Sequence, residues 1–279
     1  MNFGTLYIVA TPIGNLEDMT VRAVRILREV DLIAAEDTRH TRKLLTHFGI
    51  SKPLTSYFDH NKTVKGTLIL DKLKDGISVA LVSDAGTPCI SDPGYQLVRD
   101  AVAVGVPVVP IPGACAAVAA LSVSGLPTDS FAFEGFLPNR GGKRREKLAM
   151  LKEEKRLLIL YEAPSRLMAT LTDIADIFGD RNVVVAREIT KIYEELLRGR
   201  VSTILAALHG RQLKGEIVLL IGPSEETPAV RDDAVADLLQ RYLFFEGITV
   251  KDAVRKVAQE TGVPKGKVYD QALRLKGDT

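Results

Sequence analysis

Residues 6–15 read LYIVATPIGN, and they contain the two features on which the expected architecture rests. The five apolar residues at 6–10 are typical of a buried strand, and the proline and glycine at 11–15 are typical of a turn. A helix is predicted next, because apolar residues recur on one helical face at Val21, Val24, Ile26, Leu27 and Val30. The chain is therefore expected to start as strand, turn and helix.

The same order returns along the first half of the chain. Further buried strands are predicted at 31–35, 79–82 and 107–110, with helical stretches between them. Apolar strands that alternate with helices favour an α/β fold, in which helices cover both faces of a parallel sheet. Prolines and glycines at 105–113 indicate a domain boundary near residue 112, so a first α/β domain is expected at 1–112.

The second half repeats this pattern less regularly, and we expect a second α/β domain at 113–223. Strands are predicted at 131–136, 157–161, 182–186 and 216–221, and helices at 165–178 and 201–209. After a polar linker at 224–228 the pattern is only helical, with helices predicted at 230–244, 249–258 and 265–275. The turn at 261–264 favours a helix-turn-helix module over 230–279; the alternative is a helical tail packed on the core.

Charge is spread unevenly along a chain whose net charge is only +2. Residues 140–156 include eight basic and three acidic side chains, an excess that could neutralise phosphates. Lys143, Arg144, Arg145 and Lys147 are the candidate RNA-binding residues, and the alternative is a solvated helix face. Tryptophan is absent and aromatic residues make up 6%, which disfavours single-strand binding by stacking on many aromatic side chains.

The sequence disfavours several kinds of site and location. Cys89 and Cys115 lack CxxC spacing and the four histidines are scattered, so neither a metal site nor a disulfide framework is predicted. The first residues lack the pattern of a signal peptide, and no apolar stretch reaches the roughly 18 residues of a membrane span. We expect a cytoplasmic protein without a membrane partner.

Chemistry is expected in the loops that follow the strands, because open α/β sheets bind ligands at the carboxyl ends of their strands. These loops read TPIGN at 11–15, EDTRH at 36–40, SDAGTP at 83–88, SDPG at 91–94, PGACA at 112–116 and YEAP at 161–164. GxxxxGK[ST] and GxGxxG are both absent, which disfavours an ordinary nucleoside triphosphatase or dehydrogenase. Any one of these loops could be a tight turn, but six of them at one edge indicate a site.

Seven runs together resemble the ribosomal-RNA branch of the tetrapyrrole methylase superfamily: LYIVATPIGNLEDMT, EDTRHT, LVSDAGTPCISDPGY, PGACAA, FEGFLP, YEAPSR and GEIVLLIG. The similarity extends from about residue 5 to residue 222, and residues 230–279 resemble the helix-turn-helix extension of that branch. It implies a class III methyltransferase fold, with S-adenosyl-L-methionine in the cleft between two α/β domains. The implied activity is 2′-O-methylation of a cytidine ribose in 16S rRNA. The substrate would be naked rRNA or the assembled 30S subunit, and the enzyme would be a homodimer.

The resemblance also implies which residues bind the cofactor. Pro12 would lie near the site of methyl transfer, and Asp84, Gly86 and Thr87 would meet the methionine part of the cofactor. Cys115 and Ala116 stand where porphyrinoid-modifying relatives often have serine or threonine, which puts a hydroxyl contact in doubt there. Segments that contact the nucleoside part would supply Glu162, Gly215 and Glu216.

Transfer to a ribose hydroxyl calls for a proton acceptor, because the hydroxyl is a weak acid. Glu36, Asp37 and Glu162 are the candidate bases, and Arg39 could orient a carboxylate or a phosphate. A structural ion pair among Glu36, Asp37 and Arg39 is the competing interpretation.

Two other functions remain open on the sequence. One is methylation of a porphyrinoid or another small molecule on the same scaffold, which the SDAGTP loop, the basic segment and the helical extension disfavour. The other is a nucleic-acid-binding regulator whose α/β part senses a ligand, which the full set of loops disfavours.

Overall fold

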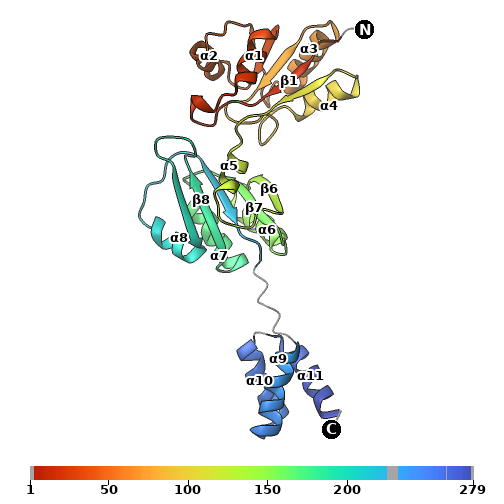
Figure 1. The fold of residues 1–279 in the computed structure, drawn as a ribbon, viewed down its shortest axis with the longest axis vertical. Helices are drawn as coiled ribbons and strands as arrows, with labels where there is room; N and C mark the ends of the chain where they lie inside the picture. Colours follow the sequence, from red (N-terminus) through yellow and green to blue (C-terminus); the bar gives the residue numbers. More distant parts are fainter. Residues whose placement is uncertain (1–2, 225–231, 262, 278–279) are drawn as a thin grey trace. The chain divides into compact units, whose positions relative to one another are not determined.

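The computed structural model describes residues 3–224, 232–261 and 263–277. The chain divides into two compact units, one ending at Pro223 and one beginning at Ser224 (Figure 1). Most of the predicted polar linker lies outside the described residues, as does Gly262 of the predicted turn. Within the described ranges, no helix is both long enough and apolar enough to span a membrane.

The first sheet is entirely parallel, with the strand order β3-β2-β4-β1-β5. Its strands are β1 (Leu6–Val9), β2 (Leu32–Ala35), β3 (Leu54–Ser56), β4 (Val79–Val82) and β5 (Val108–Ile111). The connecting helices are α1 (Val21–Glu29), α2 (Thr38–His47), α3 (Lys62–Lys74) and α4 (Tyr95–Ala103). The short strand β3 was not predicted from the sequence.

Apolar side chains cover both faces of this sheet, as the strand pattern predicts. Ile33 and Val82 pack with α1 and α2 in one buried cluster, whereas Ala34 and Leu81 pack with α3 and α4 in another. Successive residues of a strand point to opposite faces, so an unbroken apolar strand supplies both clusters. The predicted parallel α/β sheet is confirmed.

The second sheet is mixed, with the order β6-β7-β10-β8-β9. Its strands are β6 (Phe131–Phe136), β7 (Leu157–Glu162), β8 (Asn182–Arg187), β9 (Glu195–Arg200) and β10 (Ile217–Ile221). Only β6 and β7 are parallel, whereas the other three pairs are antiparallel. The apolar residues of a strand do not specify its direction. Strand β9 was not predicted from the sequence because half of the residues in ELLRGR are charged.

Helices also cover both faces of the second sheet. Buried residues of α6 (Gly141–Leu151), α7 (Leu167–Phe178) and α8 (Val201–Leu208) form one cluster with the strands. The short helix α5 (Ala116–Ser122) packs on the opposite face. The loop that leads into α5 is PGAC, one of the segments expected to bind a ligand.

Within its described residues, the unit that begins at Ser224 contains four helical segments. These are α9 (Asp232–Gln240), the π-helix η2 (Arg241–Phe245), α10 (Val250–Thr261) and α11 (Lys265–Gly277), and they overlap the three predicted helices. Val235, Leu239, Val257 and Val268 are almost completely buried in a cluster that belongs to this unit alone. It therefore has its own hydrophobic core.

Candidate functional site

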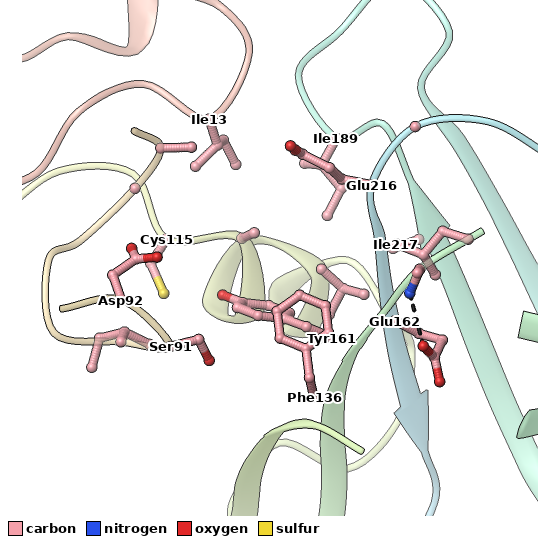
Figure 2. A pocket seen from close by; sticks show the side chains of 18 of the residues that line it. Ile13, Ser91, Asp92, Cys115, Phe136, Tyr161, Glu162, Ile189, Glu216 and Ile217 are labelled. Atoms are coloured by element: carbon pink, nitrogen blue, oxygen red, sulfur yellow. Dashed lines mark hydrogen bonds between the residues drawn. The ribbon is translucent and has the colours of Figure 1, made fainter. Parts of the chain in front are cut away.

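A cavity of about 370 Å³ opens at the carboxyl ends of strands from both sheets, and the amino end of the antiparallel strand β10 also contributes to its wall. This volume lies in the usual range of small-molecule sites, about 300–1,000 Å³. Figure 2 shows its walls, with Asp92 and Cys115 on the left, Glu162 and Ile217 on the right, and Tyr161 between them. The walls are largely apolar, with a few polar groups, a composition typical of a site for a small organic ligand.

Backbone and side-chain hydrogen bonds hold the first-sheet loops of the cavity together. The N–H of Thr11 donates to the carbonyl of Gly86 at 2.9 Å, and the N–H of Gly86 donates back at 3.1 Å. The hydroxyl of Thr87 donates to the carbonyl of Ala114 at 3.2 Å, which joins SDAGTP to PGAC. Gly86 has a φ of 80°, a left-handed conformation that favours glycine. Three loops distant in sequence thus form one rigid wall.

Asp92 is the ionisable group of this wall that sequence reasoning missed. It lines the cavity, and burial raises the pKa of its carboxyl to about 6, assisted by the nearby carboxylates of Glu36 and Asp84. A hydrogen bond with Ser83 acts in the opposite direction. A carboxyl with a pKa near 6 can exchange a proton close to neutral pH.

The segment that carries Asp92 has a strained backbone. Cys89 and Ser91 have φ values of 72° and 64°, which are uncommon for residues other than glycine. Gly94 follows at a φ of 149°, and a Cβ there would lie 2.4 Å from Sγ of Cys89. Strain of this kind concentrates at functional sites. The SDPG sequence at 91–94 was the available signal, although no role was assigned to its aspartate.

Aromatic side chains from the second sheet form the middle of the cavity. The ring of Tyr161 contacts those of Phe133 and Phe136 edge-on, with centroid distances of 5.0 and 5.6 Å. Burial raises the pKa of Tyr161 to about 12, so its hydroxyl stays protonated at neutral pH. Phe136 is 58% exposed, which leaves apolar surface available to a ligand in the cavity.

Glu162 has a structural role at the base of the YEAPSR loop. Its side chain is buried and accepts hydrogen bonds from Thr170 Oγ1 at 2.6 Å and from the backbone N–H of Ala163 at 2.8 Å. Arg166 also donates to it at 3.4 Å, and to the carbonyl of Leu137 at 2.7 Å. These contacts fix the loop against β6, but they leave Glu162 poorly placed to act as a base.

An ion-pair network supports the far side of the cavity. Lys191 Nζ lies 2.8 Å from Oε1 of Glu188 and 3.0 Å from Oε2 of Glu216. The ammonium group lowers the pKa of Glu188, whose Oε1 also accepts the N–H of Glu216 at 3.0 Å. A Cβ on Gly215 would lie 2.2 Å from the Glu188 carboxyl carbon, so the network depends on glycine at this position.

The three predicted catalytic residues lie outside the cavity walls. Asp37 and Arg39 form an ion pair at 2.7 Å, and Asp37 also accepts the N–H of Arg39 at 2.8 Å as the cap of α2. These contacts lower the pKa of Asp37. Burial, followed by the charge of Asp84, raises the pKa of Glu36. The arrangement agrees with the structural ion-pair interpretation for Asp37 and Arg39.

Most of the predicted cofactor-binding residues are brought together by the fold. The cavity wall includes seven of the nine, namely Gly86, Thr87, Cys115, Ala116, Glu162, Gly215 and Glu216. Pro12 is adjacent to Ile13, which does line the cavity. Asp84 instead accepts a hydrogen bond from the backbone N–H of Asp37 at 3.0 Å. Its observed role is to join two loops.

Of the predicted RNA-binding residues on α6, three pair with carboxylates. Arg144 is buried and lies 2.7 Å from Asp173, which also pairs with Arg145 at 2.6 Å. Lys147 pairs with Glu134 at 2.8 Å. A buried guanidinium in an ion pair is not available to a phosphate, so Arg144 does not suit the predicted role. Lys143 is exposed.

Family models match both units of the chain. Residues 5–205 match the model described as Tetrapyrrole (Corrin/Porphyrin) Methylases. Residues 231–276 match the model described as RsmI C-terminal HTH domain.

Curated relatives are similar over nearly the whole chain. Two of them are named Ribosomal RNA small subunit methyltransferase I and are 49% identical to it. The protein from Halalkalibacterium halodurans aligns over 96% of this chain and 94% of its own length. The protein from Synechocystis sp. aligns over 99% of both.

A solved structure shares the fold. Uroporphyrin-III C-methyl transferase from Thermus thermophilus, complexed with S-adenyl homocysteine, aligns with a TM-score of 0.56. The alignment covers 78% of this chain and 97% of that one, at 18% sequence identity.

Proposed function

This chain belongs to the tetrapyrrole methylase family, and we propose that it transfers the methyl group of S-adenosyl-L-methionine to small-subunit ribosomal RNA. The acceptor we propose is the 2′-oxygen of a cytidine ribose, in naked 16S rRNA or in the assembled 30S subunit. The similarity to proteins named Ribosomal RNA small subunit methyltransferase I, over nearly the full length of the chain, supports small-subunit rRNA as the substrate class. We further propose a cytoplasmic homodimer.

The chemistry of the cavity fits the proposed cofactor. Apolar side chains of Ile13, Ile189 and Ile217 can hold an adenine ring, and the aromatic surface of Tyr161 and Phe136 lies beside them. The carboxylate of Asp92 offers negative charge to a cationic sulfur. When bound, S-adenosyl-L-methionine supplies an electrophilic methyl group on that sulfur. A related fold binds the demethylated product of this cofactor, which supports the assignment.

Asp92 is our candidate for the residue that accepts the proton of the ribose hydroxyl. It lines the cavity, and with a pKa of about 6 it is largely ionised at neutral pH. Glu162 and Glu216 also line the cavity, but both carboxylates have hydrogen-bond or ion-pair partners that occupy them. We therefore propose Asp92 as the base, in place of Glu36, Asp37 and Glu162.

The remaining catalytic contribution is positional. The hydrogen bonds that join the loops at Thr11, Gly86 and Thr87 hold one wall rigid, and the Glu188–Lys191–Glu216 network holds another. Rigid walls keep both reactants aligned, which lowers the entropic cost of bringing them together. Transfer to a hydroxyl in the cavity can then depend mainly on alignment and on the proton acceptor.

A direct assay of substrate class tests the proposal. Purified protein would be incubated with tritiated S-adenosyl-L-methionine and, separately, with 30S subunits, naked 16S rRNA, 23S rRNA and a porphyrinoid. We expect label in small-subunit rRNA and none in the other acceptors. Transfer to the porphyrinoid alone would identify a small-molecule methyltransferase. Transfer to no acceptor, with cofactor binding retained, would favour a ligand-sensing protein.

A further inference from the structure

Helix α2 and the segment after it form an unusually basic stretch. Residues 38–58 contain no aspartate or glutamate, whereas Asp37 and Asp59 flank them on either side. The same 21 residues include Arg39, His40, Arg42, Lys43, His47 and Lys52. A helix with this composition carries a positive charge that its own sequence does not balance.

The basic side chains of α2 lie on its exposed side. Thr41, Leu44 and Leu45 are the buried residues of the helix and attach it to the sheet. Arg39, His40, Arg42 and Lys43 are all exposed. Arg39 pairs with Asp37, whereas Arg42 and Lys43 form no salt bridge with any carboxylate in the described part of the chain. Arg42 and Lys43 are thus available to an external anion.

Helix α6 differs from α2 in this respect, although its sequence is at least as basic. Arg144, Arg145 and Lys147 are each paired with an aspartate or glutamate of the same unit. A basic side chain that already has a carboxylate partner must give up that contact before it can bind a phosphate. Of the four candidate RNA-binding residues on α6, only Lys143 has no carboxylate partner in the described part of the chain, whereas α2 offers Arg42 and Lys43.

The start of α2 is connected directly to the cavity wall. The backbone N–H of Asp37, which caps the helix, donates to Oδ1 of Asp84 at 3.0 Å. Asp84 is followed immediately by Ala85, Gly86 and Thr87, which line the cavity. A helix of ten residues is about 15 Å long. The helix that carries Arg42 and Lys43 therefore begins at a loop that borders the cavity.

We infer that the exposed side of α2, through Arg42 and Lys43 and with His40 beside them, binds phosphates of the RNA strand that flanks the methylated nucleotide. This inference rests on the proposed function, because it assumes that the substrate is RNA. Phosphate contacts position a strand without reading its sequence. Their contribution should therefore depend on salt and be independent of the base that is modified.

The test compares two pairs of substitutions that change the net charge equally. Arg42→Gln/Lys43→Gln removes the unpaired charges of α2. The control, Lys72→Gln/Lys74→Gln, removes exposed charges from the last turn of α3, which packs on the opposite face of the sheet from α2. Affinity for a 16S rRNA fragment would be measured from 50 to 200 mM salt. Thermal unfolding and calorimetric affinity for S-adenosyl-L-methionine would show whether fold and cavity are intact.

Loss of two phosphate contacts should reduce the slope of log affinity against log salt by about 1.4, since each contact on a single strand contributes about 0.7. At 0.1 M salt this corresponds to roughly 25-fold weaker RNA binding. The α3 control should match the wild type, and Arg42→Lys/Lys43→Arg should retain both affinity and slope. A wild-type slope in Arg42→Gln/Lys43→Gln would overturn the inference, provided that the wild-type protein methylates rRNA. A wild-type protein that neither binds nor methylates rRNA would overturn the proposed function, and the inference with it.

Discussion

Asp92 shows how strongly its surroundings determine what one residue can do. An exposed aspartate has a pKa near 4, at which its carboxylate is a weak base. In the cavity wall, burial and the carboxylates of Glu36 and Asp84 raise that value to about 6. The side chain thus remains mostly ionised at neutral pH while becoming a better proton acceptor.

Substitution Asp92→Asn should lower kcat/KM for rRNA methylation by about 100-fold or more, the usual contribution of a general base. In the wild type, kcat/KM should rise with pH through about 6 as Asp92 loses its proton, and in the variant this rise should disappear. Affinity for the cofactor, measured by calorimetry, separates the possible roles. A variant with normal turnover, or one whose whole defect is weaker cofactor binding, would exclude Asp92 as the base.

Gly215 is a residue whose missing side chain matters. A Cβ there would collide with the Glu188 carboxyl group, which holds Lys191 and the N–H of Glu216. Gly215→Ala should therefore weaken cofactor binding about tenfold, the equivalent of one charge-assisted hydrogen bond. Gly210→Ala is a matched control, because Gly210 also has a positive φ but has no atom within 4 Å of the added Cβ. Equal cofactor affinities of the two variants would show that the Glu188 contacts do not support the site.

At the scale of elements, α6 shows that a run of basic residues in the sequence need not give free positive charge on the protein surface. The run of basic residues at 140–156 suggests a phosphate-binding face. In the fold, α7 brings Asp173 and Asp176 against α6, where they pair with Arg144 and Arg145. Nothing in the local sequence of α6 reveals those partners, because they lie about 30 residues further along the chain.

The buried pair in α6 predicts a loss of stability on substitution. Arg144→Gln removes the only buried guanidinium that contacts Oδ2 of Asp173 in the described structure, and should lower the free energy of unfolding by about 3 kcal/mol. Lys143→Gln, one position earlier on an exposed site, should leave it nearly unchanged. Urea unfolding measures both. If Arg144→Gln were as stable as Lys143→Gln but bound RNA more weakly, Arg144 would be an RNA-binding residue and not a structural one.

Strand positions were largely predictable from the sequence, whereas strand directions were not. The runs at 6–10 and 79–82 are apolar throughout, which is typical of strands covered on both faces. All four residues of β4 and the two end residues of β1 are buried. The run at 217–221, within the strand predicted at 216–221, is equally apolar, yet it lies antiparallel to both neighbours. The direction of a strand depends on the connection that returns the chain to the sheet. The residues of the strand itself do not show which neighbours it pairs with or in which direction.

The candidate site was predictable to a similar extent. Loops after the strands were recognisable from glycine and proline, and most residues assigned through the family resemblance do line the cavity. Asp92, Tyr161 and Ile189 line one cavity although they come from three separate segments of the chain. The raised pKa of Asp92 likewise depends on Glu36, which lies 56 positions earlier in the chain.

At the scale of the whole molecule, the chain consists of a unit that contains the cavity and a unit with a separate core. A chain ending at Ser224 should fold and bind S-adenosyl-L-methionine with unchanged affinity, because every residue of the cavity wall is retained. We expect it to methylate rRNA poorly, as the helices beyond Ser224 would then serve to hold the substrate. Calorimetry and the tritium assay measure the two properties. Full methylation by the shortened chain would make those helices a structural appendage, and loss of cofactor binding would make them part of the catalytic unit.

The most direct test of the central claim is the identity of the methylated nucleoside in rRNA. 16S rRNA would be isolated from cells that lack this protein and from the same cells carrying either the wild type or Asp92→Asn, and then digested and mapped. We expect one 2′-O-methylated cytidine that is absent without the protein, restored by the wild type and not restored by Asp92→Asn. Methylation on a base, or an rRNA methylation pattern that does not change with the protein, would contradict that claim.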